Sequence, residues 1–340
     1  MPKTIRNQYD KHLTYEKLMD AHKKSRKSKN RKEELILFNL KQEEYIRWLY
    51  EKLKTGTYKH GGYTEFYISE PKLRKIEKAR YLDRIVHRWV VDNFLIDNFC
   101  TTFIDTSYAC IKNKGMHVAA IDVQKAMKEC KRKWGNYYIL KTDIAKYFDS
   151  IDKDILMKIL KRKIKDKKLM WLINEILYKQ KRKKGLEIGN YTSQTFANIY
   201  LNELDYYIKH VLHIKYYFRY MDDGVLLLKS KQEATETLEK MKKFLKDELE
   251  LELNRKTQIF PSKQGVNFCG YKINEYRLKL RTAGKKRLKN KVKTLQSKVK
   301  EGRMSSKEAK KYLAGHYGYI KIANTYNLEQ KLFPANYKIY

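Results

Sequence analysis

The sequence predicts an α+β fold in which helices pack against an antiparallel sheet. The middle of the chain alternates strand-like stretches with amphipathic helical ones, and basic helical stretches lie before and after it. Residues 214–229 contain two β-rich runs around a tight polar turn with Asp-Gly, which predicts an antiparallel hairpin. With four prolines and 14 glycines in 340 residues, and no low-complexity linker, the chain reads as one continuous body.

Each predicted element has its own pattern. Strands are expected at 63–70, which Pro71 ends, and at 137–144, 251–260 and 266–281. Helices are expected at 84–100, after Asp152, at 169–178, from Thr192 or Ser193 onward, at 231–247 and through most of 283–340. Predicted caps are Asp152 and two capping boxes, Ser230 with Glu233 and Ser305 with Glu308.

The charge balance indicates a polyanionic partner. The chain has 76 Lys plus Arg against 39 Asp plus Glu, which gives a net charge of +37. Such an excess repels itself in a compact fold unless an anion neutralises it, and a nucleic-acid backbone is the obvious one. An anionic membrane surface is the alternative, but neither a lipidation signal nor a strongly amphipathic terminal helix supports it. The basic run from Lys23 to Lys32 is either a solvated face or an RNA-contacting arm.

Cysteine usage and hydropathy exclude several other classes of protein. None of the four cysteines forms a C-x-x-C pair, which argues against a zinc knuckle. No apolar run approaches the ~20 residues that a membrane span needs. No signal-peptide pattern follows Met1. We therefore expect a reduced, cytoplasmic protein without a membrane partner.

Three aspartates form the strongest chemical signal. Asp222 and Asp223 lie in Tyr220-Met-Asp-Asp-Gly224 between two apolar strands, and Asp143 ends a strand of its own. A common Asp-Gly turn does not explain two adjacent carboxylates, because like charges repel at a hairpin tip. A divalent cation relieves that repulsion, and Mg²⁺ prefers carboxylates plus substrate phosphates. Two such ions, ~4 Å apart, activate a primer 3′-hydroxyl and stabilise the departing pyrophosphate.

In order and spacing, these segments resemble the palm motifs of reverse transcriptases, over roughly residues 63–340. The resemblance implies a right-hand polymerase fold. Its parts would be a basic helical N-terminal extension at 1–62, fingers and palm at 63–282, and a helical basic thumb at 283–340. The implied activity is RNA-directed DNA synthesis from dNTPs on an RNA template with a DNA or RNA primer. Asp143, Asp222 and Asp223 would be catalytic and would bind two Mg²⁺ ions, or Mn²⁺ in their place.

The resemblance also implies roles for other residues. Lys72 and Arg74 would bind the triphosphate of the incoming nucleotide, where Arg forks onto phosphate. Phe148, five residues after Asp143, would lie under the sugar and exclude a 2′-hydroxyl. Lys256, with Arg255 as the competing assignment, would protonate or screen the leaving pyrophosphate. Phe268 and Gly270 would form the primer grip. Taken singly, the charged residues are compatible with a plain surface role, and Phe148 with a core position.

One segment departs from the common reverse transcriptase pattern. Ile188 precedes Gly189 where Gln is usual, and Gln194 stands where Pro is usual. This version most resembles reverse transcriptases of diversity-generating retroelements, in which the Ile188 position lies against the templating pair and is linked to errors opposite template adenine. We expect all three residues to contact substrate.

This closer resemblance implies mutagenic retrohoming, a basic accessory protein oligomer as partner, and a bacterial, archaeal or phage origin. Antiviral, retron-like and intron-type reverse transcriptases are the alternatives. An alternative from another class is a catalytically silent RNA-binding protein on a polymerase fold. The three intact aspartates argue against that reading, because a silent protein has no need for carboxylates at a hairpin tip.

Overall fold

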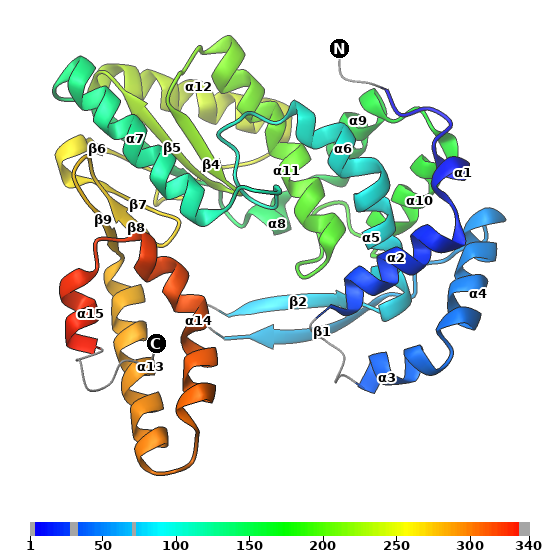
Figure 1. Cartoon of the computed structure of the whole chain (residues 1–340). Coiled ribbons are helices and arrows are strands. Elements are labelled where there is room, and N and C mark those ends of the chain that lie inside the picture. Colours follow the sequence, from blue (N-terminus) through cyan, green and yellow to red (C-terminus); the bar gives the residue numbers. More distant parts are fainter. Residues whose placement is uncertain (1–3, 28–32, 70–72, 333–340) are drawn as a thin grey trace. The chain divides into compact units, whose positions relative to one another are not determined.

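The structure is a computed structural model that describes residues 4–27, 33–69 and 73–332. Its mixture of helices and strands confirms the predicted α+β class (Figure 1). The chain divides into two compact units, each assembled from three separate stretches. The first unit contains residues 1–104, 144–207 and 242–253, and the second contains residues 105–143, 208–241 and 254–340.

Helices make up most of the first unit. Near the N-terminus they are α1 (Tyr9–His12), α2 (Tyr15–Arg26), α3 (Glu33–Leu40) and α4 (Gln42–Lys54). Later in the chain they are α5 (Tyr81–Val90), α6 (Ile96–Phe99), α8 (Tyr147–Ser150), α9 (Lys153–Lys163), α10 (Lys167–Leu177) and α11 (Tyr191–Tyr206). A π-helical turn, Val91–Leu95, separates α5 from α6, so the helix predicted at 84–100 is interrupted.

Aspartate caps fix where two of these helices begin. Asp152 accepts hydrogen bonds from two backbone amides at the start of α9, as predicted. Asp166 caps α10 through the amide of Leu169, and its other carboxylate oxygen accepts from the amides of Gln8 and Tyr9. Because one buried carboxylate satisfies both segments, the N-terminal stretch is fastened to α10.

An antiparallel hairpin of β1 (Tyr63–Ile68) and β2 (Arg74–Ala79) also belongs to the first unit. Most of β1 is exposed, whereas the end of β2 is buried. The amide of Glu77 donates to the carbonyl of Ile188 at 3.0 Å. The side-chain amide of Asn190 accepts from the Ala79 amide at 3.0 Å and donates to the Glu77 carbonyl at 2.8 Å. An isolated two-stranded hairpin is marginally stable, so these bonds to the loop before α11 anchor it.

The second unit is built on a four-stranded antiparallel sheet with the order β4-β5-β3-β6. Its strands are β3 (Tyr138–Asp143), β4 (Tyr217–Tyr220), β5 (Asp223–Leu228) and β6 (Gln258–Pro261). The hairpin predicted at 214–229 is therefore confirmed. A separate three-stranded sheet contains β7 (Val266–Phe268), β8 (Tyr271–Ile273) and β9 (Leu278–Leu280).

The strand predicted at 251–260 is correct only in its final part. Residues 254–257 form a turn instead, because the Asn254 side chain accepts from the Lys256 amide at 3.1 Å and the Asn254 carbonyl accepts from the Thr257 amide at 2.9 Å. Asn commonly starts such turns by bonding the backbone two residues ahead.

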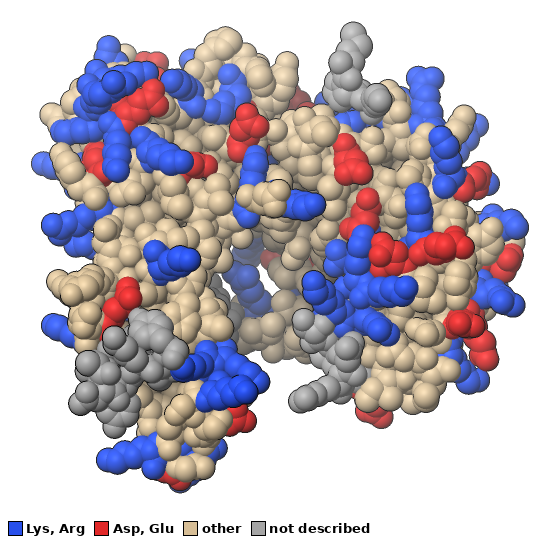
Figure 2. Space-filling model, viewed as in Figure 1, with Lys and Arg blue, Asp and Glu red and all other residues tan. Residues whose placement is uncertain are grey.

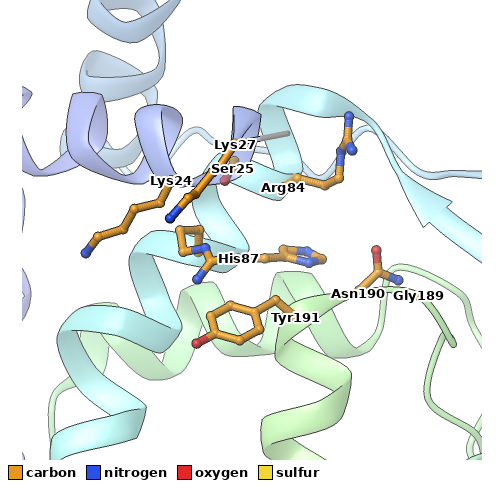
Figure 3. A pocket seen from close by; sticks show the side chains of 9 residues that line it. Lys24, Ser25, Lys27, Arg84, His87, Gly189, Asn190 and Tyr191 are labelled. Atoms are coloured by element: carbon orange, nitrogen blue, oxygen red, sulfur yellow. The ribbon is translucent and has the colours of Figure 1, made fainter. Parts of the chain in front are cut away.

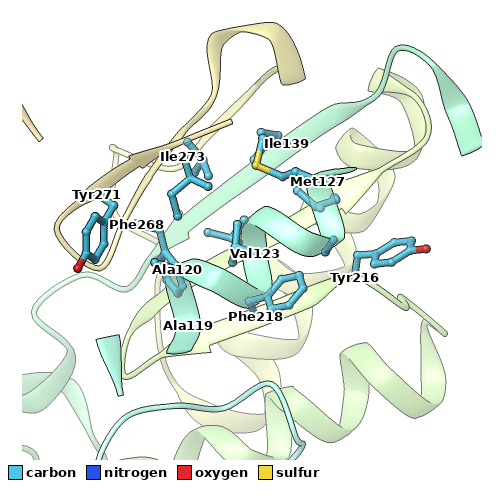
Figure 4. Close-up of a cluster of buried hydrophobic side chains, with 14 of the residues drawn as sticks. Ala119, Ala120, Val123, Met127, Ile139, Tyr216, Phe218, Phe268, Tyr271 and Ile273 are labelled. Carbon is cyan, nitrogen blue, oxygen red and sulfur yellow. The ribbon is translucent and has the colours of Figure 1, made fainter. Parts of the chain in front are cut away.

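The helix α7 (Met116–Trp134) covers one face of the four-stranded sheet (Figure 4). Successive strand residues point to opposite faces, so alternate apolar residues of β3, β4 and β5 face this helix. The resulting core includes Ala120, Val123 and Met127 of α7, Ile139, Phe218, Val225 and Leu227 of the sheet, and Phe268 and Ile273 of the β7–β8 hairpin. This core fixes the sheet that carries the three aspartates.

The remaining helices are α12 (Lys231–Leu249), α13 (Thr282–Lys300), α14 (Ser306–Ile322) and α15 (Tyr326–Leu332). Leu288, Val292, Leu313 and Ile320 contribute to a small core shared by the last three helices. The capping box of Ser305 with Glu308 is confirmed. At α12, Ser230 caps as predicted, but Glu233 accepts from the amide of Lys229. The helix α13 carries many Lys and Arg residues and no acidic one.

Candidate active site

A two-residue turn joins β4 to β5 and carries Asp222. Tyr220 lies opposite Asp223 in the strand register, so the turn residues are Met221 and Asp222. The structure corrects the expected Asp-Gly turn, because Asp223 and Gly224 are the first residues of β5. Met221 has a φ of +56°, a conformation that hairpin turns usually assign to glycine. The turn is therefore strained at the residue beside the aspartates.

A buried arginine holds this turn in place. The Arg219 side chain is only 2% exposed, and its Nη1 donates to the Met221 carbonyl at 3.0 Å. Its backbone is fixed as well, because the Arg219 amide donates to the Thr106 carbonyl and the Tyr108 amide donates to the Arg219 carbonyl. Strained backbone persists where the surroundings over-determine it. The sequence prediction missed Arg219, although a charge inside an apolar strand was a signal.

Gly224 allows the central strands to approach each other. It lies opposite Thr142 of β3, and a Cβ atom at this position would meet the Thr142 Oγ1 atom at 2.4 Å. A contact this short requires a shift of the Thr142 side chain or of one of the two strands. The glycine therefore serves the strand pairing that positions the two neighbouring aspartates, and its role is steric.

Replacing Gly224 with alanine is expected to lower stability by about 1–3 kcal/mol, as overpacking does. Thermal or urea unfolding measures this change. Adding Thr142→Ala, which removes the Oγ1 atom, is expected to restore most of the loss, whereas Thr142→Ser retains Oγ1 and should not. Equal rescue by the two second substitutions would contradict the steric explanation.

Asp143 and Asp223 lie directly opposite each other across β3 and β5. Side chains of such a pair project from the same face of the sheet. The Asp143 backbone is held on its other side, where its carbonyl accepts from the Asn254 amide at 2.7 Å. The strand register thus brings together two carboxylates that are 80 residues apart in the sequence, with Asp222 next to one of them.

Lys141 lies among these carboxylates and was not predicted. It forms an ion pair with Asp223, and its ammonium lies 5.2 Å from the centre of the Phe268 ring. Burial lowers the pKa of Lys141 to about 8, although the charges of Asp143 and Asp222 act to raise it. Its position two residues before Asp143 on one strand face was the available signal. Lys141 therefore supplies positive charge to the aspartate group.

The oxygen atoms of the three aspartates suit a hard divalent cation. Mg²⁺ binds carboxylates, waters and substrate phosphates. In the parts of the chain that the structure describes, no three His, Cys, Asp or Glu side chains are grouped closely enough to hold one ion. Asp223 instead contacts Lys141. The donor chemistry of the opposed Asp143 and Asp223, with Asp222 adjacent, fits Mg²⁺ or Mn²⁺.

Two further predicted groups belong to the same unit. Lys256 is exposed in the 254–257 turn, whose first residue is hydrogen-bonded to Asp143. Phe268 and Gly270 flank Cys269 in the β7–β8 hairpin, and the turn residues Cys269 and Gly270 both have positive φ. Phe268 as a whole is only 1% exposed and lies in the core, whereas Gly270 is half-buried, so Gly270 is the more accessible of the two to a primer.

The other predicted substrate residues belong to the first unit. Arg74 is exposed at the start of β2, and Lys72 lies outside the described residues. Phe148 is half-buried in α8, and Gln194 is exposed on α11. The Ile188 loop is bonded to β2 and has Gly189 at a φ of +113°, where a Cβ would meet Ile76 at 2.8 Å. The structure thus brings Ile188 and Gly189 together with β2.

The family model for reverse transcriptase (RNA-dependent DNA polymerase) matches residues 64–273. The chain belongs to this family. The match covers the β1–β2 hairpin, the Ile188 loop and all three aspartates of the β3–β5 strands.

Two curated relatives have similar sequences. The group II intron-encoded protein LtrA of Lactococcus lactis subsp. cremoris is 26% identical over 306 residues, which cover 68% of this chain and 50% of LtrA. Protein YkfC of Escherichia coli (strain K12) is 25% identical over 275 residues, which cover 67% of this chain and 71% of YkfC. The reverse transcriptase chain thus spans about half the length of LtrA.

Solved telomerase structures have the same fold. The telomerase of Candida albicans, in complex with a TWJ fragment of telomeric RNA, superposes with a TM-score of 0.53 at 11% identity, over 88% of this chain and 65% of that one. Apo telomerase from Candida tropicalis gives 0.50 at 12% identity, over 64% and 55% of the two chains. The likeness supports the right-hand polymerase fold.

Among the described helices, none combines the length and apolar character that crossing a bilayer requires.

Proposed function

We propose that this protein is an RNA-directed DNA polymerase that extends a DNA or RNA primer with dNTPs on an RNA template. The observation that carries the proposal is the pairing of Asp143 with Asp223 across β3 and β5, next to the Asp222 turn, within the segment that matches the reverse transcriptase family. The net charge of +37 supports a nucleic-acid substrate. In domain terms, residues 63–282 would be fingers and palm, and residues 283–340 the thumb.

Asp143, Asp222 and Asp223 would hold two Mg²⁺ ions, whose chemistry when bound is to acidify the primer 3′-hydroxyl and neutralise charge on the phosphates. Lys141 balances the carboxylate charge. Lys72 and Arg74 would orient the triphosphate, Lys256 would donate a proton to the leaving pyrophosphate, and the β7–β8 turn at Gly270 would align the primer.

We propose further that the enzyme misincorporates nucleotides opposite template adenine, as part of a diversity-generating retroelement with a basic accessory protein. The support is Ile188, whose aliphatic side chain offers no hydrogen bond where reverse transcriptases usually have Gln. The Ile188 backbone is firmly held: its carbonyl accepts from Glu77, and Asn190 bonds the carbonyls of Glu77 and Glu187. A rigid loop with an apolar side chain checks shape without polar contacts.

The test is extension of a DNA primer on a defined RNA template with Mg²⁺, followed by sequencing of the products. Wild-type errors are expected to concentrate opposite template adenine, and Ile188→Gln is expected to reduce them several-fold. Ile188→Val, which keeps an apolar branched side chain, is the matched control and should retain the wild-type error pattern.

Each other outcome has a distinct meaning. Accurate wild-type copying would leave the polymerase assignment intact and favour an intron-type, retron-like or antiviral enzyme. If no extension occurs, even with the accessory protein and native RNA present, the chain is better described as an RNA-binding protein on a polymerase fold.

A further inference from the structure

A pocket of about 360 Å³ lies in the first unit between α2, α5 and the loop that leads into α11. Figure 3 shows Lys24 and Lys27 on one side of it and Asn190 and Tyr191 on the other, with His87 between them. Arg84 and Arg88 complete a set of four lining cations, and no lining residue is acidic. Figure 2 shows Lys and Arg side chains gathered in the region of α2 and β2.

Carboxylates outside the lining fix these cations in position. Lys24 pairs with Asp92 at 3.2 Å and with Asp20 at 2.8 Å, and Arg84 pairs with Glu34 at 2.9 Å. Arg88 approaches Asp92 at 3.7 Å. Three carboxylates thus pair with three of the four lining cations, and one of them, Glu34, also pairs with Lys78, so an excess of positive charge remains. Cations that are already held in place bind an anion with a smaller loss of side-chain entropy.

Two neutral polar side chains of the lining, His87 and Asn190, are engaged within the protein. The His87 Nε2 atom lies 3.1 Å from His60 Nε2, and its Nδ1 atom lies 3.2 Å from Thr192 Oγ1. Burial holds the pKa of His87 well below its usual range, so this ring is neutral. The Asn190 side chain uses its oxygen and its amide hydrogens on backbone groups. Reading a base edge needs matching donors and acceptors, and these two side chains do not offer them.

The remaining lining groups suit phosphate and stacking. Ammonium and guanidinium groups bind phosphate through charge-assisted hydrogen bonds. The Arg88 guanidinium carbon lies 4.1 Å from the centre of the Tyr191 ring. This stacked pair forms a flat surface for a sugar or base. The volume is at the small end of the ~300–1,000 Å³ typical of ligand pockets, so it takes one nucleotide unit and excludes a duplex.

We propose that this pocket binds the phosphate and sugar of one nucleotide in the unpaired part of the RNA template, regardless of its base. The pocket shares Gly189 with the Ile188 loop, and that loop would contact the templating base pair. The identification of the bound strand as the template therefore rests on the proposed function. Binding that does not depend on the base suits a template, because every nucleotide of the copied RNA would pass through the pocket in turn.

The double variant Lys24→Gln/Lys27→Gln tests this proposal. Its matched control is Lys11→Gln/Lys161→Gln, which removes the same charge from exposed positions of the same unit outside the pocket lining. Binding is measured by fluorescence anisotropy over a range of salt, with template–primer duplexes that have or lack a 5′ RNA overhang. Thermal unfolding of both variants checks that they are folded.

The pocket variant is expected to lose about 10-fold in affinity for the overhang substrate, and the slope of log K against log salt should fall by about 0.7 for each lost phosphate contact. Oligo(U) and oligo(A) overhangs should give the same loss, and the duplex without an overhang should show little. An equal loss in the Lys11/Lys161 control, or an equal loss on the blunt duplex, would overturn the proposal.

Competition with AMP and with inorganic phosphate separates a strand from a small ligand. One result would show that the pocket holds a free nucleotide or phosphate and that the strand proposal is wrong. In that result, AMP or phosphate binds the wild-type protein tightly and the pocket variant weakly, and neither compound changes binding of the overhang substrate. Wild-type primer extension is measured in parallel. Its absence would count against the proposed polymerase activity, whereas the overhang binding data report on the pocket alone.

Discussion

Asp222→Asn is expected to reduce primer extension by about 10³-fold or more, with little effect on folding. The amide keeps the size of the side chain but removes the charge that a divalent cation requires. A 10³-fold loss corresponds to about 4 kcal/mol of transition-state stabilisation. Single-turnover extension of a DNA primer on an RNA template measures the effect, and the same loss is expected for Asp143→Asn because it lies opposite Asp223.

The matched control is Asp247→Asn, an exposed aspartate on α12 that should leave extension unchanged. RNA binding and the unfolding temperature of the Asp222 variant should stay near those of the wild type, because the residue lies in a turn and is half-exposed. Extension by Asp222→Asn within a few-fold of the wild-type rate would show that this carboxylate does not take part in the reaction.

Phe148→Ala is expected to weaken the selection of dNTPs over ribonucleotides by about 100-fold, the range in which a steric pocket discriminates. We propose that the half-buried ring excludes the 2′-hydroxyl from the nucleotide site. The backbone of Phe148 is fixed, since its carbonyl accepts from the Leu186 amide at 2.8 Å. The measurement is the ratio of kcat/KM for a deoxynucleotide and its ribonucleotide counterpart.

A ratio cancels any general loss of activity, so partial destabilisation of the variant does not mimic the effect. Phe244→Ala serves as control. Phe244 lies in α12, its ring centre is 4.3 Å from that of Tyr207, and it has no proposed contact with nucleotide. If both alanine variants keep the wild-type ratio, Phe148 is a packing residue and the selection against ribonucleotides arises elsewhere.

Local patterns predicted much of the fold. The strands at 63–70 and 137–144 and the hairpin at 214–229 were recognisable, because their side chains alternate or follow β-rich runs between turns. The caps at Asp152 and Ser305 were predictable because a cap acts on amides two or three residues away. The strand predicted at 251–260 failed in its first part because an Asn turn outweighs strand propensity.

Long-range pairing produced what these patterns missed. The turn moved to Met221 and Asp222 because β5 pairs with β3 from Asp223 onward. The buried Arg219 side chain donates to the turn carbonyl of Met221, and the Arg219 backbone bonds the single segment 106–108. No periodicity within β4 encodes those partners, since they are set by the segment around residue 107.

The sequence by itself determined the family of this protein. The aspartates, the excess of basic residues and the order of the motifs are all properties of the chain before it folds, and they identify the family. Tertiary structure alone decided that Asp143 lies opposite Asp223, that Lys141 forms an ion pair with Asp223, and that Gly224 makes room for Thr142. The physical reason is register: a strand fixes the side-chain period, but only pairing with a distant strand determines which side chains meet.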